Sequence, residues 1–301
     1  MDSKPSTRRA VAPRLQTQIR AEVEAALGTL ENPAECWEKR VHATRKHLKR
    51  LAALSRLQAS LAHEPLPRID RAATAAVKRR LGRLREPFAE LELWVKISPA
   101  FPAASAAAVQ AILQRRRLES ASPERTRLTL QRCEQVLAGL CRKLSTRPGV
   151  DGAAQEFDAN ALFLALRLGY RKGRRALVRA QKKPNWQRLH ALRRANQVHR
   201  HQLQFVEQFL QSELKAQRKL AARVSDQLGE HHDLGSIQVH LAEIADRAEQ
   251  PAIRKKLRRR MKKIGKRALR GAKEVFAERP KAFERCVRRS FERGSAVVGG
   301  S

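Results

Sequence analysis

Two stretches of the chain place a histidine and several basic residues on one face of a predicted helix. In the first stretch these residues are His42, Arg45, Lys46, Lys49 and Arg56. In the second stretch the same face holds His190, Arg193, Arg194, Gln197 and His201. Like charges at these spacings repel each other, so a chain that builds this basic stripe twice is expected to bind an anion against it.

The histidines also suggest a metal site, which is one alternative for this surface. Zinc sites usually show a close pair such as His-Glu-x-x-His with a third ligand, and neither His-x-x-His nor His-x-x-x-His occurs in this sequence. Another alternative treats His42 and His190 as hydrogen-bonded residues at the edge of a basic surface. We favour their placement on the anion-facing side, where neighbouring cations are expected to lower the pKa of each imidazole.

Acidic residues that would suit a hydrolase are few. Glu90 and Glu92 lie on opposite sides of a helix, whereas Glu230 and Asp233 can share a face. We expect Asp233 to fix a neighbouring Arg or His or to cap a helix. The phosphate-binding patterns Gly-x-x-x-x-Gly-Lys-Ser/Thr and Gly-x-Gly-x-x-Gly are absent from the sequence. We therefore expect a binding protein without catalytic residues, metal or cofactor, and a metal-dependent phosphohydrolase is a distant alternative.

Positive charge dominates the composition. The 301 residues include 64 Lys and Arg against 29 Asp and Glu, and the resulting net charge of +35 favours a polyanionic partner. Hydrophobic residues make up 42% of the chain and aromatic residues 4%, which together favour a folded helical core. No apolar run approaches the ~20 residues of a membrane span. The four cysteines form no Cys-x-x-Cys pair, and we expect a cytoplasmic protein.

The scarcity of aromatic residues bears on the choice of polyanion. Nucleic-acid-binding proteins often stack bases on aromatic side chains. Tyr170 is the only aromatic residue within a basic cluster, and Trp37, Trp94 and Trp186 are expected to be packing residues. Cations without stacking groups favour a phosphate polymer that carries no bases. DNA or RNA binding stays the alternative, because nucleic acid uses the same charge and would compete for it.

Hydrophobic periodicity predicts an all-α chain. The predicted helices cover residues 15–30, 34–61, 68–85, 88–97, 103–118, 123–144, 154–181 and 184–211, a helix leading into 228–233, then 234–248, 251–275 and a short last helix. Pro87 separates two of these helices, residues 64–67 form a turn, and residues 145–152 are the best midpoint linker.

The two halves of the chain repeat. His42 and His190 are 148 residues apart, and Gly82 and Gly229, each preceded by Leu, are 147 residues apart. An acidic residue follows each of these glycines by four positions, as Glu86 and Asp233. Features that keep register over such a span indicate an internal duplication.

These residues and motifs resemble those of the CHAD domain family, the conserved histidine α-helical domain. The segments that carry the resemblance are Val41–Leu51 with His42, Arg45, Lys49 and Arg50, its second copy Leu189–Arg194, the Tyr-x-x-Gly-Arg segment within Gly169–Leu177, Leu228–Leu234 and Gly271–Pro280. Together they span most of residues 15–289. Some members of the family are fused to a triphosphate-tunnel (CYTH) domain, which carries a Glu-x-Glu-x-Lys signature. This signature is absent from the sequence, so the chain looks like a stand-alone member.

The resemblance implies two antiparallel four-helix-type bundles related by a pseudo-twofold axis, with a basic channel between them. It implies one domain over residues 14–291, with halves at 14–147 and 153–291 and flexible tails at 1–13 and 292–301. The implied activity is binding of inorganic polyphosphate, with polyphosphate granules as a candidate location. The residues expected to bind polyphosphate are His42, Arg45, Lys46, Lys49, Arg50, Arg56, Lys78, Arg79, Arg83, Arg167, Arg171, Arg174, Arg175, His190, Arg193, Arg194, Arg200 and His201.

The second signature helix departs from the family pattern. Gln197, Val198 and His201 stand where basic or aromatic residues are frequent in the family, as does Ala52 in the first helix. The second helix is therefore less cationic. Other arginines of the second half, which are Arg171, Arg174, Arg175 and Arg200, are expected to compensate.

Overall fold

The structure of the chain is a computed structural model that describes residues 11–61, 69–145, 159–209, 214–241 and 250–298. Within these ranges all regular structure is helical, which confirms the predicted all-α fold. The α-helices are α1 (Val11–Glu31), α2 (Trp37–Leu61), α3 (Arg71–Ile97), α4 (Ala103–Ser120), α5 (Pro123–Ser145), α6 (Ala159–Lys182), α7 (Trp186–Val206), α8 (Lys215–His240), α9 (Gln250–Val275) and α10 (Pro280–Val298). Two 3-10 turns, η1 (Ser98–Ala100) and η2 (Glu207–Phe209), follow α3 and α7.

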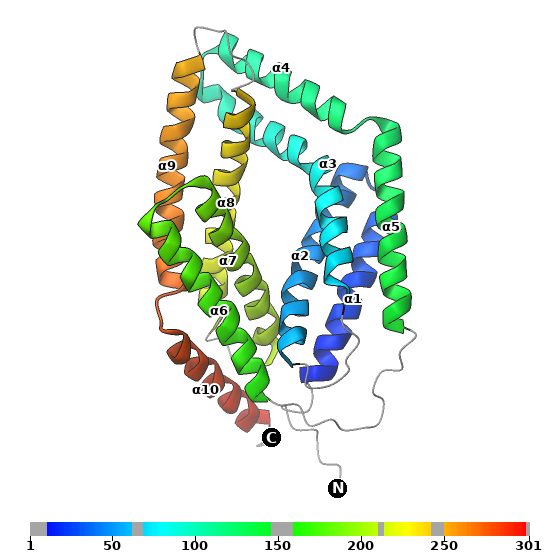
Figure 1. Cartoon of the computed structure of the whole chain (residues 1–301), viewed down its shortest axis with the longest axis vertical. Coiled ribbons are helices and arrows are strands. Elements are labelled where there is room, and N and C mark those ends of the chain that lie inside the picture. Colours follow the sequence, from blue (N-terminus) through cyan, green and yellow to red (C-terminus); the bar gives the residue numbers. More distant parts are fainter. Residues whose placement is uncertain (1–10, 62–68, 146–158, 210–213, 242–249, 299–301) are drawn as a thin grey trace.

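Helix α3 corrects the prediction that Pro87 separates two helices. The helix begins at Arg71, where the Asp70 side chain accepts a hydrogen bond from the Ala73 amide, and it continues through Pro87 to Ile97. Proline removes one backbone hydrogen bond and kinks a helix rather than always ending it. Pro87 is buried, and Figure 1 shows α3 changing direction along its length. Packing on the apolar residues on both sides of the proline outweighs the lost hydrogen bond.

Helix α8 likewise runs unbroken where two helices were expected. It spans Lys215–His240 and contains the buried Gly229 and Gly235. Each helical glycine costs about 1 kcal/mol relative to alanine, so a close neighbour is the usual reason for keeping one. A Cβ atom on Gly235 would stand 2.6 Å from the Trp186 ring, so this glycine makes room for the tryptophan.

The two basic helices lie side by side. Helix α2 packs against α1, α3, α6 and α7, and helix α7 packs in turn against α8. Figure 1 shows α2 and α7 next to each other in the lower half of the molecule. The outer helices α5 and α10 cover α1 and α6, respectively. The fold therefore brings the two copies of the basic stripe onto neighbouring helices.

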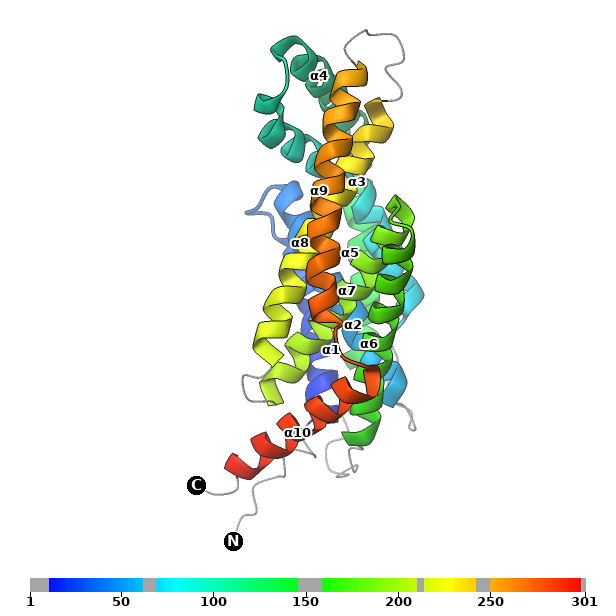
Figure 2. The same ribbon diagram turned by 90° about the vertical axis from the view of Figure 1, so that its left-hand side faces the viewer.

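The hydrophobic core joins both halves of the chain. Its main cluster includes Leu48 and Leu51 of the first half together with Leu192 and Phe276 of the second half. A second cluster forms where α3, beyond Pro87, meets α4, α8 and α9. The upper ends of these four helices lie together in both views (Figures 1 and 2). The C-terminal end of α3, which belongs to the first half, therefore packs against α8 and α9 of the second half.

Hydrogen bonds fix this crossing of α3. The Ser236 hydroxyl donates to the Glu90 carboxylate over 2.5 Å, and His240 Nε2 lies 3.4 Å from the other carboxylate oxygen. One turn further along α3 the Trp94 indole donates to the Ala106 carbonyl over 3.1 Å. Glu90 is 4% exposed, so this polar link is made inside the interface.

Several expectations fall wholly or partly outside the described residues. These are the turn at 64–67, the linker at 146–152 and the outer parts of the two tails. Helix α1 begins at Val11 and α10 ends at Val298, so helix covers the inner part of each expected tail. The pseudo-twofold axis and the channel stay predictions. No helix in the described ranges is both long enough and apolar enough to cross a membrane.

Candidate anion-binding site

Arg45 of α2 and Arg193 of α7 are central to the site. Both guanidinium groups are half-buried, and burial lowers the pKa of each. The two arginines lie close enough for the charge of Arg193 to lower the pKa of Arg45 further. Arg45 Nη1 donates to the Lys78 carbonyl of α3 over 2.8 Å, which holds its side chain between α2 and α3.

A glycine lies under each of these arginines. A Cβ atom on Gly82 would stand 2.7 Å from Arg45 Nη1, and a Cβ atom on Gly229 would stand 3.5 Å from Arg193 Nη2. The two glycines are the pair that the repeat relates by 147 residues, and the two arginines are 148 residues apart. The same arginine-on-glycine contact is therefore made in both halves, with less space at Gly82.

Six further side chains lie near this pair, and their charges act on one another. We call the eight residues the central cluster, which comprises His42, Arg45, Lys49, Arg56, Lys78, His190, Arg193 and Arg194. Burial is the largest cause that lowers the pKa of each shifted member, and neighbouring cations are the next cause for most of them. The members come from α2, α3 and α7. A concentration of partly buried cations is a site that an anion stabilises.

Lys49 carries the largest pKa change in the central cluster. Burial, followed by the charges of Arg193, Arg45 and Lys78, lowers its pKa to about 8. An ammonium group with this pKa loses part of its charge just above neutral pH. A bound anion would restore the charge, because an opposite charge raises the pKa of a lysine.

Two carboxylates lie within the central cluster that were not predicted as site residues. Burial raises the pKa of Glu86, and burial raises the pKa of Asp233 to about 6, while the charges of Arg45 and Arg193 act in the opposite direction on them. Asp233 lies near Arg193. This position agrees with the expectation that Asp233 would fix a neighbouring Arg or His. The sequence feature that pointed to these two carboxylates was the acidic residue four positions after each repeated glycine.

The two repeated histidines lie at the edges of the cluster. Burial and then Lys46 and Arg85 lower the pKa of His42, and burial and then Arg194 and Arg193 lower that of His190, as predicted. Arg85, which was not predicted as a site residue, donates from Nε to His42 Nδ1 over 3.4 Å and pairs with Glu92 over 2.6 Å.

Trp186 corrects the expectation that all three tryptophans are packing residues. Its side chain is 42% exposed, whereas Trp94 is fully buried. The indole stacks on His190 at 5.5 Å and on His232 at 5.2 Å between ring centroids. The same ring lies against Gly235 of α8, where a Cβ atom would stand 2.6 Å away. Tyr170, in contrast, is fully buried and donates to the Glu278 carbonyl over 3.2 Å.

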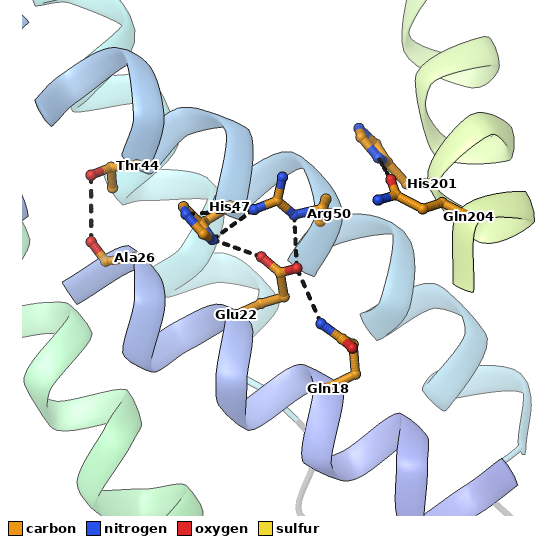
Figure 3. A network of polar contacts seen from close by, with 8 residues as sticks. All are labelled: Gln18, Glu22, Ala26, Thr44, His47, Arg50, His201 and Gln204. Carbon is orange, nitrogen blue, oxygen red and sulfur yellow. Dashed lines mark hydrogen bonds and ion pairs between the residues drawn. The ribbon is translucent and has the colours of Figure 1, made fainter. Parts of the chain in front are cut away.

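Arg50 is held by α1 rather than by the central cluster. Its Nε donates to the Glu22 carboxylate over 2.7 Å, and His47 Nδ1 lies 2.8 Å from the other carboxylate oxygen (Figure 3). Hydrogen bonds from these two side chains lower the pKa of Glu22 against the effect of its burial. Arg50 was predicted from its place in the signature helix, and the structure gives it a protein partner.

Two arginines of α6 also have protein partners. Arg174 donates to the backbone carbonyls of Phe276, Ala277 and Glu278 at 2.8, 2.9 and 2.9 Å, where α9 gives way to α10. Arg167 pairs with Glu284 of α10 over 2.7 Å. These contacts fix α9 and α10 on α6.

The remaining predicted residues lie on several surfaces. Lys46 lies next to His42, and Arg79 next to Lys78. His201, whose pKa burial lowers to about 4, lies near Arg200, Arg50 and Lys49 and contacts the Gln204 side chain at 3.3 Å (Figure 3). Arg171 and Arg175 are exposed on α6. Arg83 faces a groove between α3 and α5.

The histidines do not gather into a metal site in the part of the chain that the structure describes. No group of three or more His, Cys, Asp or Glu side chains comes together there as a metal ion would require. His199 is fully buried among Tyr170, Phe276 and Phe283 at ring-centroid distances of 5.3 to 5.4 Å.

Comparisons with known proteins agree with this architecture. The family model described as CHAD domain matches residues 14–242. The crystal structure of the CHAD domain from the plant Ricinus communis is similar over 92% of this chain and 93% of that chain, with a TM-score of 0.51 and 16% sequence identity, which is a likeness of fold. No curated protein matches the sequence. Because the family model covers about three quarters of its length, the chain belongs to the CHAD domain family.

Proposed function

We propose that the central cluster binds inorganic polyphosphate and that the protein acts by binding rather than by catalysis. The observation that carries the proposal is the pair Arg45 and Arg193, half-buried on adjacent helices within a cluster of cations that exceeds its carboxylates. A phosphate chain would neutralise these charges one after another. Guanidinium groups suit this ligand, because they offer paired N–H donors to phosphate oxygens.

The proposed binding depends on salt in a characteristic way. Each phosphate that a cation neutralises releases condensed counterions, so the logarithm of the affinity falls linearly with the logarithm of salt concentration. The six arginines and lysines of the central cluster would give a slope of about −4 if each contacts one phosphate of a single chain. A much shallower slope would mean that fewer of these cations reach the ligand.

Retention on immobilised long-chain polyphosphate tests the site. We expect Arg45→Glu with Arg193→Glu to abolish retention while circular dichroism reports the same helix content. The matched control is Arg259→Glu with Lys263→Glu, which makes the same charge change at two exposed positions of α9. Retention of the first variant at the level of the control would refute the site assignment.

Nucleic acid is the second candidate ligand, and Trp186 is the observation that favours it. An exposed indole beside a cationic cluster can stack on a base. Competition separates the two ligands: polyphosphate should displace labelled DNA at equal phosphate concentration and physiological salt. Displacement in the opposite direction would favour the nucleic-acid function. Phosphate released from long-chain polyphosphate, and lost on chelation, would instead support the phosphohydrolase alternative.

Polyphosphate granules are the location that this proposal favours. A fluorescent fusion of the whole chain should collect on granules in cells that accumulate polyphosphate. The Arg45→Glu/Arg193→Glu variant should stay diffuse, and granule association of that variant would separate localisation from the central cluster.

A further inference from the structure

A second concentration of arginines lies between α3 and α5. Four arginines, Arg80, Arg83, Arg125 and Arg132, line a groove with a volume of about 380 Å³. Two of them come from α3 and two from α5, so the groove exists only because these helices pack together. The volume lies within the range of small-ligand sites.

The groove lies on the opposite side of α3 from the central cluster. At 100° per residue, Lys78 and Arg85 share one face of α3, whereas Arg80 and Arg83 project from the other side. On α5, Arg125 and Arg132 are seven residues apart and share a face with Thr129. The fold therefore separates the cations of α3 into two sites.

The charges of the groove are not balanced by the protein. None of the four guanidinium groups has a hydrogen-bond or ion-pair partner among the residues that the structure describes. Glu86 lies near enough to Arg83 for their charges to interact, but it forms no ion pair with it there. One carboxylate, Glu124, lines the groove with them. Four cations around one hollow with one carboxylate repel each other and create a positive potential that attracts an anion.

Polar side chains complete the lining. The hydroxyls of Ser122 and Thr129 face the groove with Ser120, whose own hydroxyl donates to the Arg117 carbonyl over 3.0 Å. Leu84 and Leu128 form the apolar part of the lining. Guanidinium groups with hydroxyls suit the oxygens of phosphate, and no aromatic side chain lines the groove to stack on a base.

We propose that the α3–α5 groove is a second anion site, which binds a short oligophosphate independently of the central cluster. The ligand class is a compact anion with adjacent phosphate groups, either as a free molecule or as the end of a longer phosphate chain. Arg83 was predicted from the sequence to be one of the polyphosphate-binding residues of the channel. In the structure it lines this groove. The proposal does not rest on the function of the central cluster, because the groove uses the opposite face of α3 together with α5, which contributes no residue to that cluster.

Calorimetric titration with tripolyphosphate at low ionic strength tests the groove. We expect two binding events in the unmodified protein. The variant Arg125→Glu/Arg132→Glu should lose one event and keep the other. The matched control Arg127→Glu/Lys143→Glu changes two exposed cations of the same helix that do not line the groove, and it should keep both events.

The central-cluster variant makes the two proposals separable. Arg45→Glu/Arg193→Glu should keep the groove event when it loses the event at the central cluster. A negative result for one of the two proposed sites therefore leaves the result for the other site interpretable. The Glu124→Gln variant provides a gain that misfolding cannot produce: removing this carboxylate should tighten the groove event about threefold. A single event in the unmodified protein, two events in the groove variant, or no gain with Glu124→Gln would each overturn the proposal.

Long-chain polyphosphate distinguishes the two sources of the ligand. If the groove takes the end of a long chain, Arg125→Glu/Arg132→Glu should weaken binding of the long chain about tenfold as well as removing the tripolyphosphate event. If the groove takes a free molecule, the same variant should lose only tripolyphosphate. Both results support a second site and assign its source.

Discussion

The guanidinium group of Arg45 lies directly against Gly82, where a Cβ atom would stand 2.7 Å from Nη1. The same guanidinium group donates to the Lys78 carbonyl one turn earlier on α3. Glycine therefore sets how closely the central arginine approaches α3. In the second half Arg193 lies over Gly229, but the corresponding distance is 3.5 Å, an ordinary van der Waals contact.

This difference predicts unequal effects of two equivalent substitutions. Gly82→Ala should push the Arg45 guanidinium away and weaken polyphosphate binding about tenfold, because a charge-assisted contact is lost. Gly229→Ala should leave binding unchanged, since its Cβ atom fits. Alanine favours a helix by about 1 kcal/mol over glycine, so we expect Gly229→Ala to raise the melting temperature. Equal losses of affinity, measured by calorimetry, would contradict a specific role for the Arg45–Gly82 contact.

The lowered pKa of Lys49 predicts a pH dependence of binding. In the protein without ligand, Lys49 has a pKa of about 8. A bound polyanion raises this pKa, so binding above pH 8 takes up a proton. Affinity should therefore fall as pH rises above about 8. Lys49→Arg keeps its charge at this pH and should flatten the curve. Lys39→Arg, at an exposed residue of α2 that pairs with Glu35, should leave the curve unchanged. Identical profiles for Lys49→Arg and the unmodified protein would exclude Lys49 as the titrating group.

Asp233 predicts a second change at lower pH. Its raised pKa of about 6 means that the carboxyl is mostly neutral at pH 5 and mostly charged at pH 7. Asp233→Asn should therefore tighten polyphosphate binding at pH 7 by about threefold, because it removes a negative charge near Arg193. At pH 5 the variant and the unmodified protein should bind alike. Asp226→Asn, an exposed acid of the same helix, serves as the control. A gain of the same size at both pH values would refute this titration.

His199 predicts a pH effect on stability. The side chain is fully buried, neither ring nitrogen has a hydrogen-bond partner within the described ranges, and burial lowers its pKa to about 3. The unfolded state therefore binds more protons between pH 3 and 6.5, so this residue costs stability as pH falls through that window.

Replacing His199 with phenylalanine should remove that dependence. We expect His199→Phe to raise the free energy of unfolding by about 1 kcal/mol at pH 7, because two unsatisfied nitrogens are lost from a space lined by aromatic rings. The gain should grow by on the order of 2 kcal/mol at pH 5. Urea unfolding at the two pH values measures both quantities. A variant that gains nothing at pH 5 would show that the imidazole is not neutral and buried in solution.

Local sequence patterns identified the elements that carry the candidate site. The spacing of His42, Arg45 and Lys49 is a property of one helix, and the helical period fixes which side chains share a face. The offset between His42 and His190 likewise revealed the repeat without any structure. The helix-face prediction concerns residues within one or two turns of each other, where backbone geometry determines side-chain direction.

Long-range packing decided which cations act together. Arg45, Arg174 and Arg50 look alike in sequence, yet Arg45 lies in the central cluster, Arg174 holds the α9–α10 junction and Arg50 pairs with Glu22. Their partners lie 28 to 104 residues away, and no local pattern encodes such contacts.

Helix α3 shows the same division between sequence and tertiary structure. Its sequence correctly indicated helix on both sides of Pro87, but whether a proline ends a helix or bends it depends on what packs around it. Here the apolar residues beyond Pro87 reach α8 and α9, and that burial keeps the helix continuous. The sequence by itself therefore determined the helical class, the basic stripes and their repeat. Only the tertiary structure decided that α2 meets α7 and that α3 packs against α5, because those outcomes depend on how helices pack.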